Sequence, residues 1–192
     1  MSTQPVKPSY DVALEEVPLI ASALSKMLDK CSFVLNQLNQ DQYVACCGYK
    51  TNFEKNQSPV GEHMRHVLEY IAIAIQGNET GVVNYDLRER DHKIQTDLEY
   101  AKQTVLELKQ KAFFITHADL SKPIDHFEAV DPDIEDEEPS PSSLKRELSH
   151  VIQHAEHHLY IMRVQCDTLG IRMPSDLGVA AATLQHEKNN PS

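Results

Sequence analysis

The chain has 192 residues, of which 41% are hydrophobic and 24% are charged, so it can bury a core as one domain. Its formal net charge of -11 argues against nucleic acid as a partner, because phosphate backbones attract basic surfaces. No apolar run reaches the roughly 18 to 20 residues that span a bilayer, and residues 1–9 lack the apolar segment of a signal peptide. We therefore expect a cytoplasmic protein with no membrane partner.

Four stretches have the apolar periodicity of α-helices, and the first two are residues 14–41 and 59–77. The second starts sharply, because Ser58 can cap it and Pro59 suits the first helical position. We expect Gly77 and Asn78 to end it. The apolar stripe of the first stretch recurs at three- and four-residue steps, at Ile20, Leu24, Met27, Cys31, Val34 and Leu38.

The other two predicted helices are residues 85–115 and 142–169. The fourth begins near Ser142 or Ser143, and Gly170 marks its end. Between these helices, residues 116–141 combine prolines with an acidic run from position 131 to 138, which predicts a long solvated loop with one short extended piece at 124–127. Residues 170–192 form a tail that we expect to pack back on the helices through its apolar stretch, 177–184.

Together these patterns predict a single all-α domain over residues 1–192. Helices at 14–41, 59–77, 85–115 and 142–169, joined by one long connection, are typical of a four-helix bundle with a crossover. No segment has the pattern of a sheet.

Ten histidines stand out, and two groups of them lie in predicted helices. His154 and His158 are four residues apart, so both imidazoles project from one face of the last helix. Imidazole binds Zn, Ni, Fe and Cu well, and a third histidine from a facing helix would complete a site. Helix 59–77 offers His63 and His66, and periodicity alone does not choose between them. The competing interpretation is that these histidines lie in the core or at its rim, each bonded to a carboxylate or carbonyl.

Side chains near these histidines in sequence are candidates for supporting roles. Arg88 or Arg90, at the start of the predicted helix 85–115, is expected either to receive an anionic substrate group or to form an ion pair at the helix end. A metal-binding histidine usually donates its second N–H to a carboxylate. The candidate carboxylates are Glu62, Glu69, Asp86, Glu147 and Glu156, of which Glu156 is expected to face solvent.

Four segments occur in an order that resembles a known group of proteins. They are SPVGEHMRHVLE at 58–69, YDLRER at 85–90, SLKRELSHVIQHAEHH at 143–158 and LGVAAAT at 177–183. In this respect the chain resembles the DinB/YfiT-like superfamily, small four-helix proteins with a three-histidine metal site. The resemblance implies a DinB-like fold over the whole chain.

The resemblance also implies which histidines bind the metal. In that superfamily one ligand follows an early glycine of the second helix by about five residues, and two more form an HxxxH pair on a later helix. The implied ligands are therefore His66, His154 and His158, with His63 as a neighbouring pocket residue. The implied cofactor is one divalent transition metal ion, Zn or Ni, and no catalytic residue is assigned.

Two functions follow from this site. The first is a divalent-metal-dependent enzyme, either a hydrolase or a low-molecular-weight-thiol transferase, with a small molecule such as a thiol as substrate. The second is a non-catalytic metal-binding or interaction module with a structural or vestigial ion, which a fourth protein ligand such as His63 or His150 would favour. Bundles of this type often pair through helix faces, so a homodimer is a further expectation.

Overall fold

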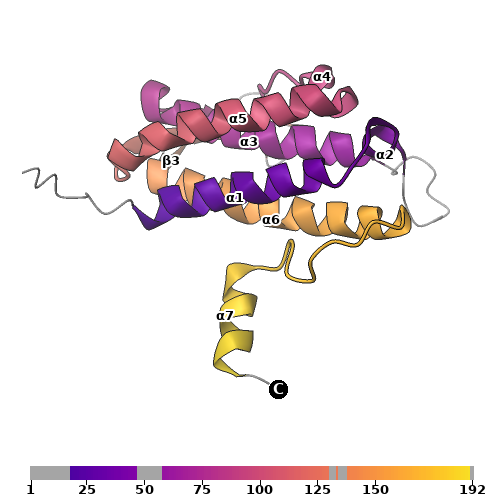
Figure 1. Cartoon of the computed structure of the whole chain (residues 1–192). Coiled ribbons are helices and arrows are strands. Elements are labelled where there is room, and N and C mark those ends of the chain that lie inside the picture. The colour runs from indigo at the N-terminus through magenta and orange to yellow at the C-terminus, as the bar shows by residue number, and fades with distance from the viewer. Residues whose placement is uncertain (1–17, 47–57, 130–132, 134–137, 191–192) are drawn as a thin grey trace, which may run out of the picture.

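The computed structural model describes residues 18–46, 58–129, 133 and 138–190. Four long helices lie side by side in it (Figure 1), namely α1 (Leu19–Asn36), α3 (Val60–Thr80), α5 (Leu98–Phe114) and α6 (Leu144–Thr168). Each of α1 and α3 contacts both α5 and α6. The shorter elements are helices α2 (Gln40–Val44), α4 (His92–Thr96) and α7 (Ala181–Asn189) and the 3₁₀ turn η1 (Ile115–His117).

A small mixed sheet also belongs to this fold. Strand β2 (Pro123–Phe127) pairs in parallel with β1 (Val82–Asn84) and antiparallel with β3 (Ser140–Ser143). The prediction of an all-α four-helix bundle is therefore wrong, since the described residues form seven α-helices and a three-stranded sheet. Strands this short offer too few residues for an alternating pattern to show in the sequence.

The first predicted helix, 14–41, is two helices in the structure. α1 ends at Asn36, and α2 starts after Asn39, whose side chain accepts from the N–H of Gln42 while Gln42 bonds back to the N–H of Asn39. This capping box starts a new helix and so divides the predicted one. Residues 14–17 lie outside the described part of the chain.

The second predicted helix starts one residue later and ends later than expected. α3 begins after Pro59, and it continues through Gly77 to Thr80. Gly77 stays helical and packs against Val83 of β1. The left-handed cap falls instead on Gly81, with φ +74°, whose N–H donates to the carbonyl of Gly77.

The third predicted helix, 85–115, is broken near its start. Residues 85–91 form an irregular connection in which Arg90 has φ +54°. The side chain of Asp91 then caps α4 by accepting from the N–H of Lys93, and Asp97 caps α5 by accepting from the N–H of Tyr100. Two aspartate caps so close together start two helices where the apolar period indicated one.

The predicted limits of the fourth helix agree with α6 to within two residues, because Ser143 accepts from the N–H of Arg146 as its cap. The extended piece predicted at 124–127 corresponds to strand β2, whereas the prediction of an irregular loop over 116–141 is wrong where β3 starts. Most of its acidic run lies outside the described residues, and of that run Asp133 and Glu138 are described and exposed.

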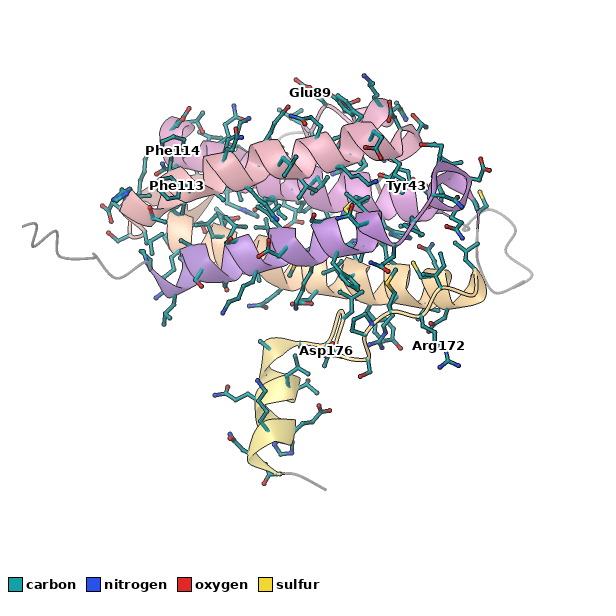
Figure 2. The ribbon with its side chains drawn as sticks, viewed as in Figure 1. Tyr43, Glu89, Phe113, Phe114, Arg172 and Asp176 are labelled. Carbon is teal, nitrogen blue, oxygen red and sulfur yellow. The ribbon has the colours of Figure 1, made fainter. Side chains whose placement is uncertain are left out.

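The tail contacts the helices over a shorter stretch than predicted. Leu177 is buried, and Gly178 lies so close to α6 that a Cβ there would stand 2.2 Å from the backbone nitrogen of Tyr160. Figure 2 shows Arg172 and Asp176 on the segment that leads from α6 to this contact. α7 buries none of its residues and projects away from the long helices (Figure 1), so the predicted packing of 177–184 is wrong beyond its first residues.

The apolar stripes of the long helices meet in one core. Buried side chains from all of these helices contribute to it, and among the most completely buried are Leu24, Leu28, Met64, Ile71, Leu148 and Leu159. No helix in the described ranges is long and apolar enough to cross a membrane. The cytoplasmic location stays a prediction.

Close packing at the start of α3 yields a first testable prediction. A Cβ on Gly61 would lie 2.1 Å from the carbonyl oxygen of Gln95, a backbone atom that cannot rotate away. We expect Gly61→Ala to lower the free energy of unfolding by about 1–3 kcal/mol, as overpacking of a close contact does. Urea unfolding followed by circular dichroism measures it. An unchanged midpoint would mean that α3 and α4 are less closely packed than described.

Candidate metal centre

Three histidines converge where α3 packs against α6. His66 comes from α3, and His154 and His158 come from successive turns of α6. The Nε2 atoms of His66 and His154 are 2.7 Å apart, and the ring of His158 has its centre 4.6 Å from that of His66 and 4.7 Å from that of His154. The four-residue spacing places the α6 pair on one face, and the packing of α3 supplies the third ring.

The ligand atoms of these three side chains lie within 4.8 Å of one another, a group that can hold a metal ion. Two nitrogens that bind one zinc ion at about 2.0–2.1 Å stand roughly 3 Å apart, so small rotations of the rings would suffice. Within the described chain the group contains imidazoles alone, which suits Zn, Ni, Cu or Fe rather than the oxygen-seeking Mg or Ca. That these histidines bind a metal stays a prediction.

The environment keeps all three imidazoles neutral near pH 7. Burial and then the nearby His154 and Arg88 lower the pKa of His66 to about 4. Burial and then His150 lower the pKa of His154 to about 4, and burial and then His66 lower that of His158 to about 3. A neutral imidazole has a free lone pair, so the group is in the state that a metal ion requires.

The other histidines of the two groups take different places. Nδ1 of His63 lies 3.1 Å from Nδ1 of His158, beside the three-histidine group rather than in it. His150 is one turn before His154, and its ring lies 5.6 Å from the ring of Tyr85. His157 is exposed on the outer face of α6. Neither His63 nor His150 belongs to the group of mutually close ligand atoms among the described residues.

A stack of aromatic rings lies against one side of the three-histidine group. The sequence did not predict this stack. The ring of Tyr70 lies between those of His154 and Tyr85, with centre distances of 4.6 and 4.5 Å and interplanar angles of 17° and 7°. The centre of the Tyr70 ring also lies 4.4 Å from the centre of the His66 ring. Its position four residues after His66 on α3 was the available signal, because that spacing places both on one helix face.

The far end of this stack is tied to a fully buried carboxylate, Glu147. Glu147 accepts from the hydroxyl of Tyr85 at 2.9 Å, from Ser142, and from Arg146 at 3.0 Å, and it lies 3.1 Å from Nδ1 of His126. Burial alone would raise the pKa of Glu147, but the hydrogen bonds from Ser142 and Tyr85 and the nearby His126 hold it below the usual value. The carboxylate thereby joins the sheet to α6.

The remaining candidate carboxylates are bonded elsewhere. Glu69 accepts from the N–H of Asp91 at 2.7 Å and lies 3.5 Å from Arg88. Asp86 accepts from the N–H of Ala129. Glu156 is half-buried in an ion pair with Lys30, so the expectation that it faces solvent is wrong.

Arg88 makes protein contacts next to the histidines. Besides its ion pair with Glu69, it donates to the backbone carbonyl of Tyr85 at 2.8 Å, and its guanidinium carbon lies 5.4 Å from the centre of the Tyr70 ring. These contacts favour the ion-pair interpretation of Arg88 over that of an anion receptor.

Comparison with known proteins gives limited similarity. No protein-family model matches the chain, and no solved structure matches it. FK506-binding protein 5 of Rhizopus delemar is 31% identical to it over 107 residues, which are 56% of this chain and 28% of that protein. The chain therefore spans less than a third of the curated relative that it matches. These findings contradict the predicted membership of the DinB/YfiT-like superfamily and leave the three-histidine group as a property of this chain's own structure.

Proposed function

We propose that this protein binds one divalent transition metal ion, Zn or Ni, through His66, His154 and His158 and uses it on a small-molecule substrate. The observation that carries the proposal is the mutual proximity of three neutral imidazoles from two helices. The relative in Rhizopus delemar is named for FK506 binding, but the matched part is just over a quarter of that protein, so the site is the firmer basis.

Three protein ligands leave a coordination position for a further molecule. Catalytic zinc sites have this arrangement, whereas structural zinc sites close the shell with a fourth protein ligand. Each of the three histidines is only partly buried. This arrangement favours an enzyme over a module with a purely structural ion.

When bound, such an ion lowers the pKa of a coordinated water or thiol, which suits hydrolysis or thiol transfer. The chain's own groups then serve to hold the site in shape. The Tyr70 ring stacks on His154 and contacts His66, and the guanidinium carbon of Arg88 lies 5.4 Å from the centre of the Tyr70 ring. A rigid support of this kind keeps ligand rings oriented for the incoming molecule.

Metal content of the purified protein tests the proposal. We expect about one equivalent of Zn, Ni or a similar ion per chain in protein prepared without chelator, and loss of that equivalent in His66→Ala and in His154→Ala. The reason is that two imidazoles alone bind too weakly to survive desalting. Elemental analysis by mass spectrometry gives the stoichiometry directly.

His157→Ala provides the matched control, because His157 is a histidine of the same helix that is exposed and outside the group. It should retain the wild-type equivalent. A wild type that takes up no metal after incubation with Zn or Ni and desalting would exclude the proposed centre. Equal metal in wild type and His154→Ala would place the ion elsewhere in the chain.

A further inference from the structure

The contact between His63 and His158 joins a histidine of the group to a histidine outside it. Their Nδ1 atoms are 3.1 Å apart, and their ring centres are 5.3 Å apart at an interplanar angle of 41°. At this distance one nitrogen donates its proton to the lone pair of the other. The contact therefore couples the tautomers of the two rings, since one Nδ1 must carry hydrogen and the other must offer its lone pair.

The placement of that hydrogen matters for metal binding. A neutral imidazole has one N–H and one lone pair, and a metal ion takes the lone pair. A metal-binding histidine is held in the required form when its second N–H has an acceptor. Carboxylates usually act as this acceptor, but the candidates here have other partners. Glu156 pairs with Lys30, Glu69 accepts from the N–H of Asp91 and lies near Arg88, and Glu62 lies 3.9 Å from Arg65.

We propose that His63 is the acceptor that positions His158: Nδ1–H of His158 donates to Nδ1 of His63, which leaves Nε2 of His158 to face the metal ion. This inference rests on the proposed function. It assigns His63, whose role the sequence left open, as a positioning residue.

The geometry separates this role from that of a fourth ligand. Among the described side chains, the ligand atoms that are mutually within 4.8 Å come from His66, His154 and His158, and His63 is outside that group. His63 lies one turn before His66 on α3, so it reaches the rim of the group at the His158 end. From there it contacts one ligand without closing the coordination shell.

The first test uses the metal-free protein, so it does not depend on metal binding. Long-range ¹H–¹⁵N correlation spectra of the histidine side chains distinguish the Nδ1–H from the Nε2–H form of each ring. We expect His158 in the Nδ1–H form in wild type and predominantly in the Nε2–H form in His63→Leu. A wild-type His158 that carries its hydrogen on Nε2 would overturn the proposal, whatever the metal content of the protein.

The second test measures zinc affinity by competition with a chromophoric chelator. His63→Leu removes the acceptor, and we expect affinity to fall about 10- to 100-fold, the usual effect of losing such a partner. His63→Asn places an amide oxygen where Nδ1 stood, so it should restore most of the affinity. Equal loss in the Leu and Asn variants would contradict the acceptor role.

A third readout distinguishes positioning from ligation. X-ray absorption of the zinc-loaded wild type and of zinc-loaded His63→Asn should give the same number of imidazole ligands, three, in both. Four imidazoles in wild type and three in the variant would make His63 a ligand and refute the proposal. Absence of zinc binding in wild type would refute the proposed function, while the tautomer measurement would still decide the contact between His63 and His158.

Discussion

Zinc is expected to stabilise the wild-type fold and to leave the His158→Ala variant almost unchanged. An ion that binds the folded chain alone adds about 2.7 kcal/mol to the free energy of unfolding at a concentration 100 times its dissociation constant. The group spans α3 and α6, which are far apart in sequence, so unfolding disperses the ligands. Thermal unfolding with and without zinc, followed by circular dichroism, measures the gain.

The stability of each protein is compared with and without zinc, because removal of an imidazole by itself also alters the packing between α3 and α6. His157→Ala should gain as much as wild type, since His157 lies outside the group. A similar gain in His158→Ala would show that zinc stabilises the fold through other side chains.

Loss of the buried carboxylate should have the largest effect on the unloaded fold. Glu147→Ala removes the partner of Tyr85, Ser142, Arg146 and His126 together. We expect the free energy of unfolding to fall by about 3 kcal/mol or more, because buried polar groups are left without a partner. Chemical denaturation measures it.

Glu99→Ala is the matched control, because the side chain of Glu99 is 80% exposed in a surface pair with Lys102. It should change the free energy of unfolding by no more than about 0.5 kcal/mol. Equal effects of the two substitutions would mean that the Glu147 network contributes little to the fold.

The same carboxylate sets the expected response to acid. The pKa of Glu147 in the folded state lies below its usual value, so the folded state binds this proton less readily than the unfolded chain. The ionised Glu147 side chain contributes fully to the free energy of unfolding above the usual glutamate pKa of about 4.3. This contribution is lost as the pH falls through the lower pKa of the folded state. The difference in stability between wild type and Glu147→Gln should therefore shrink at low pH.

Sequence periodicity identified the long helices better than it identified their ends. The stripes of α1, α3, α5 and α6 are visible because each repeats over several turns. Side-chain caps at Asn39 and Asp91 decided where the short helices α2 and α4 start, and a local signal of this kind is hard to distinguish from an ordinary polar residue inside a helix. The sheet was missed because its partners are distant in the chain and its strands are short.

The sequence by itself determined that His154 and His158 share a helix face, because a spacing of four residues is a local property of a helix. Only the tertiary structure decided that His66 reaches this pair while His63 stays outside the group and contacts His158, since that depends on how α3 is rotated and shifted against α6. The same packing stacks Tyr70 between His154 and Tyr85 and buries Glu147 beneath the sheet. Periodicity places a side chain on a face, and the contact between two faces is established only when the helices pack.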